Sequence, residues 1–197
     1  MTDDALAPWR AENSRVLVES PWIRLRAERC VTRRGAVLDP FYLIDYPDWV
    51  HVAAFDDEDR LLLVRQYRHG AKAVSLELPG GCMDPHETDP IAAGARELLE
   101  ETGYTAATIR RLAKLSPNAA LQTNGLHILL AFGARLAQVQ RLDATEDIVV
   151  EPTPWREAAR LALSGEMIHA PHVGLLLMAL AKAKGVRFGP CSDQAKA

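Results

Sequence analysis

The sequence predicts a layered sandwich of strands and helices, of the α+β or α/β class. Short apolar runs separated by turn residues fill the region before residue 80, one helical pattern follows, and strands and then helices complete the chain. The length of 197 residues and the hydrophobic content of 48% suit one domain of moderate size with its own core.

The first part of the chain is expected to be β structure. Apolar and β-branched residues favour strands at 15–19, 22–33, 37–46, 49–55, 61–67 and 73–78. The acidic run at 56–59 is typical of a turn and predicts a hairpin between the strands on either side of it. Residues 1–13 lack such a pattern and are expected to form a loose lead-in.

A helix is predicted over residues 90–102. Asp89 and Pro90 are typical of an N-cap and a first helical residue, and Gly103 is typical of a C-terminal stop. Helical spacing predicts which side chains of this segment face the core: Ile91, Ala95, Leu98, Leu99 and Thr102.

Three glutamates of this helix, Glu97, Glu100 and Glu101, lie at positions i, i+3 and i+4 and are expected on the side away from the core. Like charges at this spacing repel each other. A magnesium or manganese ion would remove the repulsion, since these cations take oxygen ligands and share them with substrate phosphates. A solvated acidic helix face is the alternative. The glycine turn at 79–81 can expose backbone carbonyls.

The remainder of the chain returns to strands at 108–115, 127–134 and 147–151, with a loop at 116–125. Helices are predicted at 154–164 and 172–184, and residues 186–197 are expected to be a disordered tail.

The composition narrows the function classes. A net charge of −3, with both signs spread along the chain, argues against a nucleic-acid partner and against a basic membrane-binding patch. The apolar run at 173–181 is too short to span a bilayer. Three cysteines without metal-ligand spacing, and a polar N-terminus, predict a cytoplasmic enzyme with free thiols.

The segment from Gly81 to Tyr104 resembles the Nudix box, G-x5-E-x7-R-E-U-x-E-E-x-G-U, in which U is a bulky apolar residue. The matching residues follow the order of the motif: Gly81, Glu87, Arg96, Glu97, Leu98, Glu100, Glu101, Gly103 and Tyr104. Eight residues instead of seven separate Glu87 from Arg96, and the loop around Thr88 can absorb the insertion.

This resemblance implies a Nudix hydrolase, which cleaves a nucleoside diphosphate linked to another group. It implies an α/β/α sandwich at residues 49–185, preceded at 1–48 by an additional N-terminal antiparallel strand region that builds a homodimer and contacts the base. Glu97, Glu100, Glu101 and the carbonyl of Gly80 would hold Mg2+ or Mn2+. An ion pair between Glu87 and Arg96 would fix the loop to the helix.

The sequences VRQYR at 64–68 and LELPGG at 76–81 resemble ADP-ribose pyrophosphatases within this family. Arg65 and Arg68 would then bind the diphosphate of the substrate. The resemblance implies adenine stacking by Trp22 and by a second aromatic, Tyr42 or Phe41.

Glu146 matches a glutamate that the family carries on a mobile loop, as a metal ligand or general base. The loop at 116–125 departs from the pattern of ADP-ribose pyrophosphatases, so nucleoside diphosphate sugars are the alternative substrates. A ligand sensor without turnover is the alternative from another class.

Overall fold

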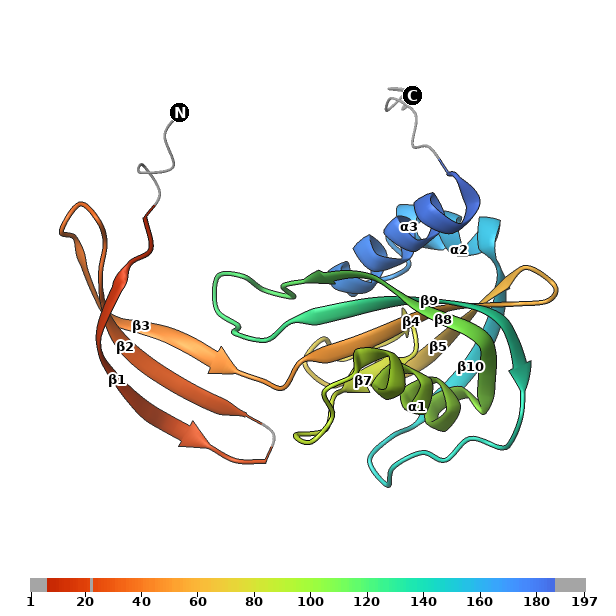
Figure 1. Ribbon diagram of the computed structural model, residues 1–197, viewed down its shortest axis with the longest axis horizontal. Coiled ribbons are helices and arrows are strands. Elements are labelled where there is room, and N and C mark those ends of the chain that lie inside the picture. Colours follow the sequence, from red (N-terminus) through yellow and green to blue (C-terminus); the bar gives the residue numbers. More distant parts are fainter. Residues whose placement is uncertain (1–6, 22, 187–197) are drawn as a thin grey trace.

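The computed structural model describes residues 7–21 and 23–186 as a three-stranded sheet followed by a larger mixed α/β unit (Figure 1). The strands and helices follow each other along the chain as β1 (Arg10–Glu19), β2 (Arg24–Val31), β3 (Val37–Asp45), β4 (Trp49–Asp56), β5 (Arg60–Arg68), β6 (Ala73–Glu77), β7 (Gly80–Cys82), α1 (Pro90–Thr102), β8 (Tyr104–Leu115), β9 (Leu126–Leu136), β10 (Ile148–Pro154), α2 (Trp155–Ser164) and α3 (Ala170–Lys184). Of the expected tail, residues 187–197 lie outside the described part. Within the described residues, no helix has both the length and the apolarity to cross a membrane.

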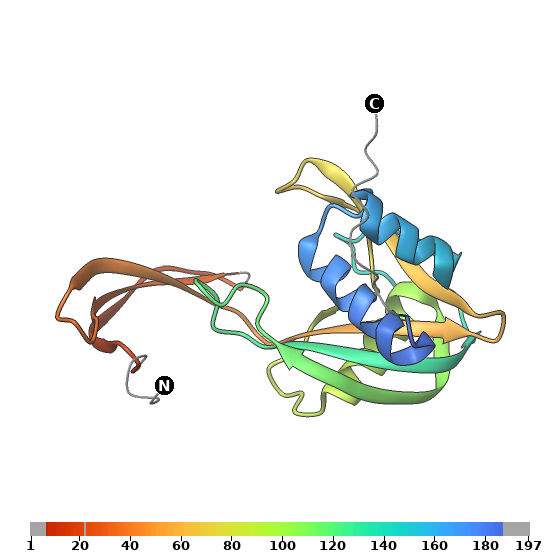
Figure 2. The same cartoon turned by 90° about the horizontal axis from the view of Figure 1, so that it is seen from above.

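The N-terminal sheet is antiparallel, in the order β1-β2-β3, and extends to one side of the larger unit (Figures 1 and 2). The prediction of a loose lead-in was wrong from Arg10 onward, because β1 pairs along its whole length with β2, from Arg10 opposite Val31 to Glu19 opposite Arg24. Every residue of β1 is exposed. A strand without a buried face lacks the alternation by which strands are found in a sequence.

The larger sheet has the order β10-β5-β4-β9-β8, with β6 also paired to β5 and β7 to β4. The predicted hairpin of β4 and β5 is present, but its residue pairing is confined to Phe55 and Leu61 beside the turn. On its other edge β4 pairs in parallel with β9 from Trp49 to Asp56, while β5 pairs with β6 and β10. The two strands therefore diverge, and β7, with Gly80 at its start, pairs with β4.

Helices cover both faces of this sheet, α1 on one side and α2 with α3 on the other (Figure 1). Strand β4 shows the division, since Val50, Val52 and Ala54 belong to the cluster under α1. Ala53 and Phe55 belong to the cluster under α2 and α3. This alternation of apolar side chains between two buried faces confirms the predicted α/β/α sandwich with its N-terminal antiparallel region.

Helix α1 has the predicted bounds and caps, and Asp89 accepts the backbone N–H of Ile91. Its predicted faces were wrong in part, since Leu98 and Thr102 are buried as expected but Ile91, Ala95 and Leu99 are not. The buried side consists of Ala93, Gly94, Glu97, Leu98, Glu101 and Thr102, and Ile91 is exposed. A Cβ atom on Gly94 would lie 2.3 Å from Leu129 Cδ1 in β9, so the helix meets the sheet through its smallest residues. Relative to the prediction, the helix is rotated about its axis, so that Glu97 and Glu101 face the interior.

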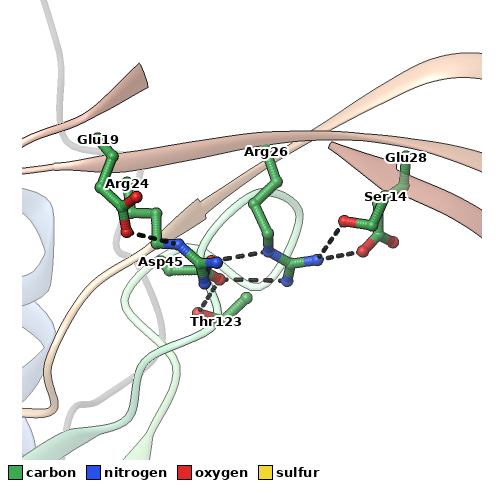
Figure 3. A network of polar contacts seen from close by, with 7 residues as sticks. All are labelled: Ser14, Glu19, Arg24, Arg26, Glu28, Asp45 and Thr123. Atoms are coloured by element: carbon green, nitrogen blue, oxygen red, sulfur yellow. Dashed lines mark hydrogen bonds and ion pairs between the residues drawn. The ribbon is translucent and has the colours of Figure 1, made fainter. Parts of the chain in front are cut away.

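The loop between β8 and β9 is attached to the N-terminal sheet. Thr123 Oγ1 donates to Asp45 Oδ1 at 3.0 Å, and Arg26 Nε donates to Asp45 Oδ2 at 2.7 Å. Figure 3 shows the Asp45 carboxylate facing Arg24, Arg26 and Thr123. The Ile44 N–H also donates to the Leu121 carbonyl at 2.8 Å. Thr123, a residue of the loop at 116–125 that departs from the pattern of ADP-ribose pyrophosphatases, is therefore engaged in a contact within the protein.

Candidate active site

The glycine turn at 79–81 lies against two carboxylates of helix α1, those of Glu97 and Glu101. Gly80 has a φ of +143°, and a Cβ atom there would lie 2.0 Å from the Val50 carbonyl oxygen, so a side chain does not fit. The Gly80 N–H donates to Glu101 Oε2 at 2.7 Å. At Gly81 a Cβ atom would lie 2.9 Å from Glu97 Oε1. The two glycines thus let the turn approach Glu97 and Glu101 closely.

Burial makes this carboxylate pair electrostatically unusual. The exposed fractions of Glu97 and Glu101 are 8% and 4%. Burial raises the pKa of Glu97 to about 7, against the opposing effect of Arg96, and nearby Glu100 and Glu146 raise it further. Burial likewise raises the pKa of Glu101 to about 8, although the Gly80 N–H opposes the shift. A cation would relieve the repulsion, and an all-oxygen donor set fits a hard divalent ion.

These shifts predict how stability depends on pH without metal. Folding raises both pKa values, so these two groups contribute most to the free energy of unfolding below the unfolded pKa near 4.3. This contribution is lost as the pH rises through the folded-state values of about 7 and 8. We expect the melting temperature to fall by ~5–10 °C between about pH 5.5 and pH 8.5, for a loss of ~2–3 kcal/mol.

Differential scanning calorimetry in the presence of a chelator measures this fall. Added Mg2+ should stabilise more strongly at the higher pH, because metal ligands must be deprotonated. A double Glu97→Gln and Glu101→Gln variant should lose the slope. A flat profile for the wild type would contradict the assignment of these two carboxylates.

Arg96 binds the loop in front of the helix as predicted. Its Nε and Nη2 atoms donate to the two carboxylate oxygens of Glu87, each at 3.0 Å. The insertion between these residues is therefore accommodated in the loop without loss of the ion pair. Nη1 lies 3.0 Å from Glu97 Oε1 and 2.9 Å from Glu100 Oε2, so one guanidinium joins the loop to two glutamates of the cluster.

A second polar group lies at the end of β6 and was not predicted. Glu77 is fully buried, and its oxygens accept from Arg68 Nε at 3.0 Å and Nη2 at 2.5 Å. His169 Nδ1 lies 3.2 Å from Oε1 and His172 Nε2 lies 3.1 Å from Oε2. Burial alone would raise the pKa of Glu77, but the contacts with His169, His172 and Arg68 lower it far below its usual range. A glutamate in an apolar strand was the available signal in the sequence.

Glu77, His169 and His172 have the residue types of a metal site, with one ligand atom of each within 4.8 Å of the others. The hydrogen bonds argue against that use. The Leu78 N–H donates to His172 Nδ1 at 3.0 Å, so this nitrogen presents its lone pair and Nε2 carries the hydrogen. The nitrogen that faces Glu77 is therefore a donor, and Arg68 occupies both carboxylate oxygens. The α1 cluster, which offers oxygen ligands only, fits a hard divalent cation better.

The model of the NUDIX domain matches residues 45–167, a range that contains the glycine turn, α1 and the cluster. The chain belongs to the Nudix family. As a member of this family, the chain is a pyrophosphohydrolase that resembles ADP-ribose pyrophosphatases. Nudix hydrolases generally need a divalent metal.

Several characterised proteins are similar to this Nudix chain. A CMP-5'-(N-acetyl-N-hydroxy-3-aminopropyl)phosphonate hydrolase of Streptomyces rubellomurinus is 30% identical over 85% of this chain and 81% of its own length. The ADP-ribose pyrophosphatase of Mycobacterium tuberculosis is 34% identical over 61% of this chain and 59% of its own length. The crystal structure of an ADP compounds hydrolase has a TM-score of 0.76 at 22% identity, covers 91% of this chain and 96% of its own, and shows the same fold.

Two other predicted site residues of this Nudix protein are Glu146, in the loop between β9 and β10, and Arg65, on β5. Glu146 accepts the backbone N–H of Asp143 at 3.0 Å, and its charge acts on Glu97, Glu101 and Arg68. Arg65 pairs with Glu151, and strand alternation places it on the face of β5 opposite Arg68.

The predicted aromatic residues belong to the N-terminal region. Tyr42 lies on β3 with an exposed fraction of 48%. The strand β3 belongs to the sheet that extends away from α1 (Figure 1). The alternative Phe41 makes an edge-to-face contact with Trp9, the ring centroids being 5.8 Å apart. Trp22 lies outside the described residues.

Proposed function

We propose that this protein is a Mg2+-dependent hydrolase of ADP-ribose, with AMP and ribose 5-phosphate as products. The observation that carries the proposal is the buried pair Glu97 and Glu101 against the glycine turn, where both pKa values are raised. The similarity to ADP-ribose pyrophosphatases supports the choice of substrate.

The metal ligands in this proposal are the carboxylates of Glu97, Glu100 and Glu101 and the carbonyl of Gly80. Mg2+, or Mn2+ in its place, supplies neutralisation of the phosphate charge and a lowered pKa of bound water. Glu100 is the most exposed of the three carboxylates, with 41% of its side chain accessible. It is therefore the ligand most open to solvent and substrate.

The protein's own groups would bind and orient the diphosphate. The pairing of Arg68 with Glu77 uses Nε and Nη2, which leaves Nη1 for a phosphate oxygen of the substrate. Glu146 is proposed as the general base that takes the proton of the attacking water, since its carboxylate lies on a loop beside the cluster. Arg96 holds Glu97 and Glu100 in position.

We propose that the N-terminal strand region, residues 1–48, makes a homodimer of the Nudix domain at 49–185. The exposed β1 with its apolar residues Val16 and Val18 supports this, as do the exposed Trp9 just before it and the extension of the sheet away from its own domain (Figure 2). Tyr42 and Trp22 would then stack on the base bound by the partner copy. Sedimentation equilibrium should give twice the 21.7 kDa chain mass, and a monomer at assay concentration would contradict the dimer.

We also propose that the protein is located in the cytoplasm. The free thiols of Cys30 and Cys82 are consistent with the cytoplasm.

A CMP-linked phosphonate is the second candidate substrate, because the Streptomyces relative that is named for one matches 85% of this chain. Measured kcat/KM values for ADP-ribose, nucleoside diphosphate sugars and a CMP-linked phosphonate, each with Mg2+, test the choice. We expect ADP-ribose to give the highest value. A preference for either other class would overturn the substrate but retain the hydrolase, while binding without turnover of any compound would indicate a ligand sensor.

A further inference from the structure

We propose that His172 and Glu77 are positioning residues that hold the Arg68 guanidinium and the backbone leading to Gly80 from helix α3. This inference rests on the proposed function, because Arg68 and Gly80 are there the diphosphate and metal contacts. Each nitrogen of the His172 ring would have a separate effect on the reaction.

The His172 ring lies between two groups at the end of β6. Its Nδ1 accepts the Leu78 N–H at 3.0 Å, and its Nε2 lies 3.1 Å from Glu77 Oε2. The ring is 1% exposed, and the rings of His51 and His169 pack against it with centroids 4.3 and 4.7 Å away. The ring is therefore fixed by its neighbours and can transmit the position of α3 to β6.

The backbone from Leu78 to Gly80 is held at each residue by a different element. His172 of α3 accepts the Leu78 N–H, Val52 of β4 donates to the Pro79 carbonyl at 2.9 Å, and Glu101 of α1 accepts the Gly80 N–H at 2.7 Å. The first of these contacts joins α3 to the turn. Its loss would leave a buried N–H without a partner and free the turn at its start.

Glu77 connects His172 to Arg68, because its carboxylate lies beside His172 Nε2 and accepts hydrogen bonds from Arg68. A buried carboxylate is stable only when it is hydrogen-bonded and paired. Glu77 accepts two hydrogen bonds from Arg68, and one nitrogen of each histidine lies within 3.2 Å of its oxygens. The two hydrogen bonds from Arg68 hold its guanidinium in the plane of the carboxylate, and the histidine rings pack beside the same oxygens. Loss of the His172 contact would let Glu77 and Arg68 shift together.

Two substitutions separate these effects. In His172→Asn the amide oxygen can replace Nδ1 as acceptor for Leu78, but the side chain is too short to reach Glu77. In His172→Gln the longer amide can reach Glu77, but the acceptor for Leu78 is lost. Leu175→Ala is the matched control, because Leu175 is a buried α3 residue of the core without a polar side-chain atom, so its loss lowers stability but removes neither polar contact of His172.

The measurements are KM and kcat for ADP-ribose, the Mg2+ concentration at half-maximal rate, and amide hydrogen exchange at Leu78. For His172→Asn we expect KM to rise about tenfold with kcat unchanged. For His172→Gln we expect kcat to fall about tenfold, the Mg2+ requirement to rise, and Leu78 to exchange faster. Leu175→Ala should lower the melting temperature with KM and kcat unchanged.

The inference is overturned if both His172 variants behave like Leu175→Ala, or if they change KM and kcat alike. Hydrogen exchange at Leu78 does not depend on turnover. If the wild type fails to hydrolyse ADP-ribose, the proposed function is wrong, and unchanged exchange in His172→Gln would still show separately that His172 does not hold the turn.

Discussion

Replacing Glu101 with glutamine should abolish turnover while leaving the metal-free protein at least as stable as the wild type. Glutamine retains an amide oxygen that can accept the Gly80 N–H, so the turn keeps its contact with α1. It removes the negative charge that a metal ligand needs. We expect kcat/KM to fall by about 10³-fold or more, the size of effect that removal of a central electrostatic group produces.

Stability separates this result from simple misfolding. Glu101 is a buried carboxylate with a raised pKa, so neutralising it removes an unfavourable charge at pH 8. The variant should therefore melt at or above the wild-type temperature without metal, and it should lose the stabilisation that Mg2+ gives the wild type. Glu58→Gln, an exposed acidic residue, is the control and should change neither property. Activity of Glu101→Gln within tenfold of the wild type would refute the ligand assignment.

Replacing Gly80 with alanine should destabilise the fold by more than about 3 kcal/mol. The new Cβ atom would lie 2.0 Å from the Val50 carbonyl oxygen and 2.8 Å from His51 Cα, and both are backbone atoms of β4 that cannot move aside alone. The φ of +143° adds strain for any side chain. Urea unfolding measures the change, and activity should be lost because the turn would move from α1.

Gly174→Ala is the matched control on helix α3. A Cβ atom at Gly174 meets nothing within 4 Å, so this substitution should be neutral or stabilise by up to about 1 kcal/mol. Equal effects of the two substitutions would show that the close approach of β4 to Gly80 is not what constrains the turn.

The sequence predicted the bounds of α1 and the residues of its cluster, but not the direction in which the cluster faces. Capping by Asp89 and Gly103 is local, and so is the spacing of the glutamates. Which face of the helix is buried depends on the sheet, where Gly94 meets Leu129. Two glutamates therefore lie at the edge of the core, contrary to the rule that charges face water.

Contacts between segments that are distant in the sequence were also not predicted. Glu77 and His172 are nearly one hundred residues apart, and no local pattern connects them. Strand β1 was missed from Arg10 to Asn13 for a related reason, since its partner β2 supplies the hydrogen bonds while its side chains stay exposed. Histidine spacing alone gave no hint that His172 contacts a buried carboxylate.

The most direct test of the central claim is chromatographic analysis of ADP-ribose incubated with the wild-type protein and Mg2+. The account predicts AMP and ribose 5-phosphate in equal amounts, and no product when a chelator replaces the metal. Product formation that persists in chelator would contradict the assignment of Glu97, Glu100, Glu101 and Gly80 as a metal site, and the absence of cleavage with Mg2+ would contradict the proposed reaction on this substrate.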